Sequence, residues 1–128
     1  MSVVQSTYFD LRDPDCTEET LTLAQARADA LGIRDILVAT TRGATGVQAA
    51  QLFQGYHLVV VTHSAGCAKP NFQELTDEHR ATIERLGGRI LTAQHAFGGV
   101  GRAVRKKLGT YELEEILAYT LRIFGEGV

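Results

Sequence analysis

Three short runs of β-forming residues recur along this chain, and each is followed by a polar loop and then by a helical pattern. The runs cover residues 36–40, 57–62 and 89–93. Apolar runs that alternate with helices are typical of a parallel sheet buried on both faces. The sequence therefore predicts a three-layer α/β/α domain with a short, mainly parallel sheet of Rossmann-like type, with strand order 89–93, 57–62, 36–40. A flavodoxin-like winding would bury the same strands and stays open as an alternative.

Cap and stop residues bound the helices between these runs. Helical spacing predicts helices over about 17–32, 45–54, 76–86 and 102–108, and a last helix after Thr110. Thr17 and Thr110 are suitable N-caps, and glycines such as Gly32 suit the helix ends. Residues 3–9 could add a short first strand. The 128 residues fit one domain spanning 1–128.

Composition excludes several classes of protein. A formal net charge of −2 argues against a general nucleic-acid or membrane binder. The first residues lack the basic start and apolar core of a secretory signal, and no apolar stretch is long enough to span a bilayer. Cys16 and Cys67 stand in unlike contexts, which predicts free thiols in a reducing cytoplasm.

The first strand-to-helix loop is rich in groups that bind anions. Glycines let the backbone approach a ligand, hydroxyls donate hydrogen bonds, and an arginine adds charge near the positive end of a helix. The predicted ligand residues here are Thr40, Thr41, Arg42, Gly43, Thr45 and Gly46. The spacing fits neither the P-loop nor the dinucleotide fingerprint, so a plain turn with Thr45 as N-cap is the alternative.

The second loop begins with a histidine just past a strand end, where a side chain can face a cleft. His63, Ser64 and Gly66 are its candidate ligand residues, and His95 holds the equivalent place after the next strand. The two histidines could share one ligand or act as acid and base, or each could merely satisfy backbone groups. The two histidines could also bind a metal together with Cys67, but no carboxylate lies near in sequence and there is no CxxC-type pairing, so no metal is predicted.

The third loop predicts a backbone nest for phosphate, built on Gly98, Gly99 and Gly101, with Arg102 as the clamp. The alternative is a flexible loop with Arg102 on a solvated basic face. Other catalytic signals are absent: there is no nucleophile elbow, Walker lysine or acidic pair. The polar residues of the 76–86 region are interpreted as one solvated helix face; they are Glu74, Asp77, Glu78 and His79.

Several of these segments resemble a known family. Residues 36–43, followed by a helix and residues 59–62, resemble the C-terminal domain of pyruvate kinase. Residues 61–66 and 95–102 resemble more closely a stand-alone, uncharacterised prokaryotic family of pyruvate-kinase C-terminal-domain-like proteins, as do residues 113–122 and the Gly125-Glu126-Gly127 end. The resemblance covers about residues 8–128.

The resemblance implies a cleft that holds a phosphate-bearing ligand. In pyruvate kinase the loop after the first strand of this domain binds a regulatory sugar bisphosphate. The matching residues here are Thr40, Thr41, Arg42, Gly43 and Thr45. In the stand-alone family the cleft is associated with a ligand such as flavin mononucleotide, so FMN is a candidate cofactor although none is certain. Because family members continue past the last glycine pair, the resemblance implies that the strand expected beside 36–40 is absent from this chain.

Three functional hypotheses remain. The first is a regulatory domain that binds a small phosphorylated molecule, such as a sugar phosphate or mononucleotide, at the carboxyl ends of the strands. The second is a flavin- or phosphate-ligand-dependent enzyme using His63 and His95, and the third is an assembly module without a ligand. A homo-oligomer is expected, because the 36–40 edge and the apolar last helix need cover from a second copy or from residues 3–9.

Overall fold

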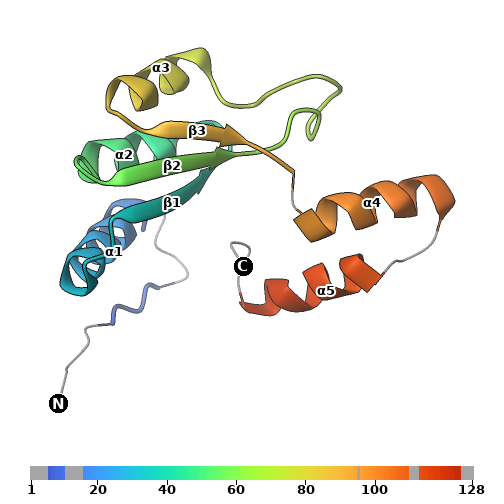
Figure 1. Ribbon diagram of the computed structural model, residues 1–128, viewed down its shortest axis with the longest axis horizontal. Coiled ribbons are helices and arrows are strands. Elements are labelled where there is room, and N and C mark those ends of the chain that lie inside the picture. Colours follow the sequence, from blue (N-terminus) through green and yellow to red (C-terminus); the bar gives the residue numbers. More distant parts are fainter. Residues whose placement is uncertain (1–5, 11–15, 95, 110–112, 125–128) are drawn as a thin grey trace.

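The computed structural model describes residues 6–10, 16–94, 96–109 and 113–124. The chain first alternates helices and strands: α1 (Thr17–Leu31), β1 (Asp35–Thr40), α2 (Ala44–Leu52), β2 (His57–Thr62), α3 (Asp77–Arg85) and β3 (Arg89–Thr92). Two further helices, α4 (Ala96–Leu108) and α5 (Leu113–Leu121), are followed by a 3₁₀ turn at Arg122–Phe124. Figure 1 shows this order from blue to red.

The strands form one parallel sheet in the order β1-β2-β3. Val38 is the partner of Val60, which in turn pairs with Ile90. The α/β class, the short parallel sheet and the strand order predicted from sequence are therefore confirmed. Because the strands are parallel and in close register, the loops that follow β1 and β2 leave the sheet at the same edge.

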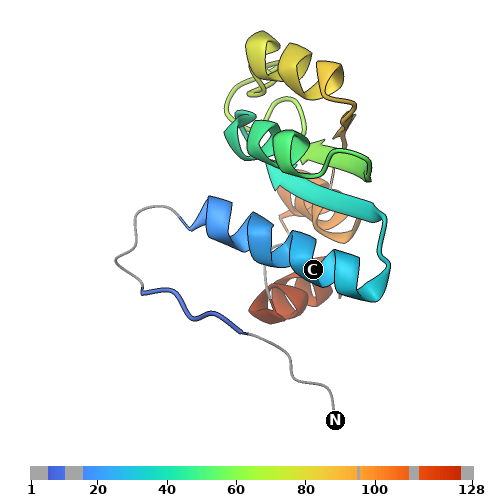
Figure 2. The same ribbon diagram turned by 90° about the vertical axis from the view of Figure 1, so that its left-hand side faces the viewer.

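The core lies between one face of this sheet and the helices α2 and α3. Every second residue of β2 points into it, and Val60 and Ile83 are completely buried there. Helix α1 packs on α2 and adds Leu21 to the same cluster. Figure 2 shows α3, α2 and α1 one above another. The buried members of this cluster are Leu21, Ala49, Ala50, Phe53, Leu58, Val60, Leu75 and Ile83.

The opposite face of the sheet carries apolar side chains that no described element covers. Leu37 is 70% exposed and Leu91 47% exposed. The sequence predicted helices on both faces, whereas the described helices that contact the strands, α2 and α3, share one face. Right-handed crossovers that step in one direction across a sheet place their helices on the same side, and both crossovers here step from β1 towards β3.

The last two helices form a hairpin apart from this core. Helices α4 and α5 contact each other, and in the described part of the chain neither contacts a strand or α1–α3. In Figure 1 the hairpin extends beyond the end of β3. The covering layer that the sequence pattern predicts for the second face is therefore not formed by the hairpin in this arrangement.

The helix ends differ in detail from their predicted positions. Helix α1 begins at Thr17 with Cys16 as N-cap and no side-chain cap bond, so Thr17 is not the cap. Helix α2 has Gly43 as N-cap and not Thr45. Gly32 does close α1 in the left-handed conformation, with φ of 68°. Residues 6–9 form no strand, and residues 3–5 and Thr110 lie outside the described residues.

Candidate functional site

The carboxyl ends of β1 and β2 bring the first two predicted loops to one edge of the sheet. Thr40 and Thr62 are partners in the parallel register and are the last residues of their strands. Residues 41–43 and 63–66 therefore leave the sheet side by side. The sequence prediction that these loops meet at one edge is correct.

The first loop is held by its own strand and by the start of α3. The Gly43 N–H donates a hydrogen bond to Thr40 Oγ1 at 3.1 Å. The Arg42 carbonyl accepts one from the Thr76 N–H at 3.3 Å, and His79 Nδ1 lies 2.8 Å from the same oxygen. A carbonyl can only accept, so Nδ1 carries the proton. The Gly43 N–H and the Arg42 carbonyl are thus satisfied by protein groups.

The glycines of this region are explained by packing. Gly43 has φ of 111°, and a Cβ there would overlap the His79 side chain and come within 2.8 Å of Leu75 Cδ1. A Cβ on Gly46 would lie 2.8 Å from Val60 Cγ1 and 3.0 Å from Ile83 Cδ1. Both positions need glycine for close approach of protein to protein, so the glycines are no independent sign of an anion.

A shallow hollow lies beside this loop, between the starts of α1 and α2. Thr45 lines it together with Cys16, Thr17, Thr20 and Leu21. The hollow faces α1 and contains none of the other predicted ligand residues. Thr45 is thereby separated from the second loop, whereas Arg42 keeps an exposed side chain at the carboxyl edge.

The second loop contains a histidine paired with a carboxylate. His63 Nδ1 lies 2.9 Å from Glu74 Oε2; the side chains are 49% and 17% exposed respectively. The carboxylate accepts, so Nδ1 donates and Nε2 is left on the other side of the ring. The interpretation of Glu74 as part of a solvated helix face is wrong: Glu74 precedes α3, whose N-cap is Thr76.

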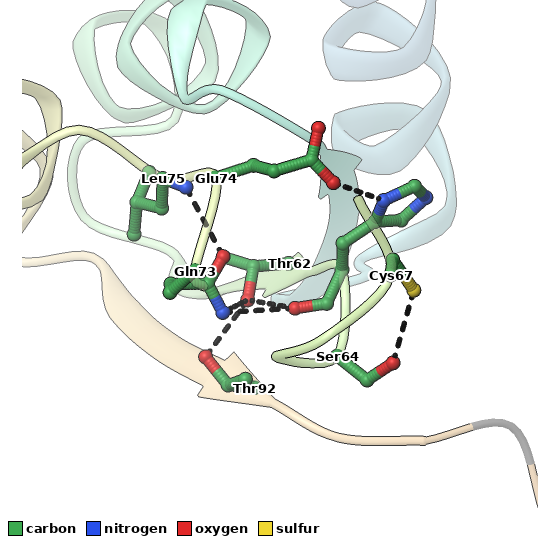
Figure 3. A network of polar contacts seen from close by, with 8 residues as sticks. Thr62, Ser64, Cys67, Gln73, Glu74, Leu75 and Thr92 are labelled. Atoms are coloured by element: carbon green, nitrogen blue, oxygen red, sulfur yellow. Dashed lines mark hydrogen bonds and ion pairs between the residues drawn. The ribbon is translucent and has the colours of Figure 1, made fainter. Parts of the chain in front are cut away.

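A polar network centred on the buried Thr62 supports this pair. Thr62 is 4% exposed, and its hydroxyl lies 2.8 Å from that of Thr92 on the neighbouring strand. The Gln73 amide donates to the His63 carbonyl at 2.9 Å and to Thr62 Oγ1 at 3.5 Å, while its oxygen accepts from the Leu75 N–H. Figure 3 shows Gln73 between Thr62 and Leu75. The network fixes the backbone that carries His63 and Glu74.

Residues 73–79 therefore connect both loops. Gln73 and Glu74 hold the second loop, and Thr76 and His79 hold the first. Sequence reasoning missed this segment because its residues lie ten or more positions along the chain from the residues to which they bond, His63 and Arg42. The one available signal was Thr76, a good N-cap that places the preceding residues in a turn beside the strand ends.

The remainder of the second loop folds back on itself. Gly66 has φ of 91°, and its N–H donates to the Phe72 carbonyl at 2.9 Å. Ser64 Oγ lies 3.3 Å from Cys67 Sγ, and the Lys69 ammonium sits 4.4 Å from the centre of the Phe72 ring. Gly66 is thus a turn residue whose N–H is used within the loop.

The predicted glycine nest is helical. Gly98, Gly99, Gly101 and Arg102 all lie in α4, so the expected loop of nest geometry is replaced by the first turns of a helix. The apolar and basic residues on either side favour a helix strongly enough to include the glycines. Helix α4 contacts only α5 among the described elements, and His95 lies outside the described residues. The structure does not bring these residues to His63.

A second histidine–carboxylate pair stands at the other end of the same strand. His57 Nδ1 lies 2.9 Å from Asp35 Oδ1, and their side chains are 80% and 84% exposed. The contact has the same length as the His63–Glu74 contact, but it lies at the amino edge of the sheet, away from the loops. This pair provides an internal reference for the candidate site.

Neither a metal centre nor a membrane-spanning helix is present in the part of the chain that the structure describes. Among those residues, no three His, Cys, Asp or Glu side chains gather closely enough to hold a metal ion. No helix in the same residues has the length and apolar character needed to cross a bilayer. The chain matches no known protein-family model.

Proposed function

We propose that the carboxyl edge of β1 and β2 binds a small anionic ligand of the phosphorylated-metabolite class, and that the chain acts as a ligand-binding, regulatory domain. The observation that carries this proposal is the His63–Glu74 pair, 2.9 Å apart, at the edge where the two strand-to-helix loops meet. In open parallel sheets this edge is the usual place for ligands.

The pair presents one ring nitrogen in a fixed direction. Glu74 is mostly buried and accepts from Nδ1, so the ring is oriented and Nε2 is available for an outside group. When protonated, Nε2–H donates a charge-assisted hydrogen bond to a phosphate oxygen. Arg42, exposed on the neighbouring loop, supplies a second cationic donor group.

The test uses the two histidine pairs against each other. Inorganic phosphate or a mononucleotide should raise the melting temperature of the wild type and of His57→Gln. The same ligand should raise that of His63→Gln and Arg42→Gln much less. A charge-assisted bond contributes about 1.5–3 kcal/mol, which corresponds to roughly 10–100-fold in affinity measured by calorimetry. Equal affinity of His63→Gln and His57→Gln would overturn the proposal.

A flavin-dependent or phosphate-ligand-dependent enzyme is the second candidate, and the same observation favours it. A histidine oriented by a carboxylate can give or take a proton at Nε2, so His63 would serve as the acid or base. Purified protein that is yellow and releases FMN on denaturation supports the enzyme, whereas colourless protein that binds phosphate supports simple ligand binding.

A further inference from the structure

The open face of the sheet has the pattern of an interface. Its centre is apolar, and Leu37 and Leu91 are its exposed large side chains. A polar row borders it at the amino ends of the strands, where Asp35 and Arg89 stand. Apolar patches with polar rims mark interaction sites, and parallel sheets are normally covered on both faces. The central residues are Leu37, Ala39, Val59, Val61 and Leu91, here called the open sheet face.

The α4–α5 hairpin is a second apolar surface without a partner on the described core. Its exposed large apolar residues are Leu108, Ile116, Leu117, Tyr119 and Leu121. The hairpin and the sheet are similar in length. The 13 residues of α4 extend about 20 Å, and the six residues of β1 and of β2 also extend about 20 Å. Two adjacent helices are about 20 Å wide, enough to cover three strands.

We propose that the α4–α5 hairpin of one copy packs on the open sheet face of a second copy, and that the exchange is reciprocal about a two-fold axis. In this structure the hairpin projects beyond the end of β3 (Figure 1). Among the described residues α4 and α5 contact no strand of their own sheet, so both the hairpin and the open sheet face are accessible to a second copy. This inference does not rest on the proposed ligand site.

The area involved favours reciprocal exchange over a single contact. Two strands about 20 Å long and one about 13 Å long, spaced about 4.8 Å apart, present a face of roughly 250 Å². One sheet face and one hairpin together bury about 500 Å², which is in the range of weak contacts. Reciprocal exchange buries about 1,000 Å², which is about the smallest area expected of a specific interface. A closed two-fold dimer is therefore the expected assembly.

The experiment is size-exclusion chromatography with light scattering on full-length chains at tens of micromolar. The wild type should elute with twice the chain mass of 13.9 kDa. Leu37→Glu, on the open sheet face, and Leu117→Lys, on the hairpin, should each elute as monomers with unchanged circular dichroism. Leu31→Glu, an equally apolar and exposed position at the end of α1, is the matched control and should remain a dimer.

Mixing the two monomeric variants tests the exchange itself. In a mixed pair, the introduced carboxylate and the introduced ammonium face each other at one contact while the other contact is wild type, so the mixture should regain the dimer mass. A monomeric wild type, a dimer insensitive to Leu37→Glu, or a mixture that stays monomeric would each overturn the proposal. A monomer whose open sheet face is protected from hydrogen exchange would overturn it too, and would assign that face to the chain's own hairpin.

Discussion

Gly46 provides the sharpest test of the packing described above. A methyl group added at Gly46 would lie 2.8 Å from Val60 Cγ1 and 3.0 Å from Ile83 Cδ1, and both side chains are completely buried. Overpacking of this kind costs about 1–3 kcal/mol. Alanine also favours the helix by about 1 kcal/mol relative to glycine. We therefore expect Gly46→Ala to lower the free energy of unfolding by about 0–2 kcal/mol, measured by urea denaturation.

A double-mutant cycle isolates the steric contribution. Ile83→Val removes the Cδ1 atom that the new methyl would meet, and alone it should cost about 0.5–1.5 kcal/mol. If the clash is real, the double variant should be about 1 kcal/mol more stable than the sum of the single effects. Strict additivity, or a Gly46→Ala variant stabilised by the full helix-propensity gain, would refute the packing argument. If Gly46→Ala instead abolishes phosphate binding without a loss of stability, Gly46 is required for ligand binding and not for packing.

Two further predictions concern single polar groups. Thr62→Val removes the hydroxyl that contacts Thr92 Oγ1 and the Gln73 amide, so we expect a loss of about 0.5–1.5 kcal/mol in urea denaturation; an unchanged midpoint would show that the network adds no stability. The Tyr56 hydroxyl donates to Asp29, and this bond raises the pKa of Tyr56 above its usual value of about 10. The bond therefore stabilises the folded state below about pH 10, and this stabilisation is lost as the pH rises through the raised pKa. Tyr56→Phe should accordingly have a lower free energy of unfolding than the wild type at about pH 8, and the difference should shrink at higher pH. Tyr119→Phe replaces an exposed tyrosine of α5 and is the control. It should change neither the free energy of unfolding nor its pH dependence.

The regular elements were largely predictable because their signals are local. Apolar runs marked the strands, and Gly32 and Thr76 acted at the predicted ends of α1 and α3. The number of layers was not predictable from the runs, because apolar residues on both sides of a strand show only that it suits burial on both faces. Which face a helix covers depends on the direction of each crossover.

The site was predictable only in part, for a similar reason. His63 stands where the end of β2 predicted it, but its partner Glu74 comes from a turn 11 residues further on. Gly43 and Gly46 were predicted as ligand residues because they are glycines near a helix start. The residues that require glycine at these positions, His79 and Val60, lie on other elements. Short glycine-rich segments are ambiguous on their own, as the helical Gly98–Gly101 segment demonstrates.

The most direct test of the proposed ligand site is a phosphate titration followed by NMR of the histidine rings. The chain has four histidines, and the His57–Asp35 pair serves as the reference within the same spectrum. We expect the ring signals of His63 to move in a saturable way with phosphate while those of His57 stay constant. Saturable changes at His57 with none at His63 would contradict the assignment of the ligand site to the carboxyl edge of the sheet.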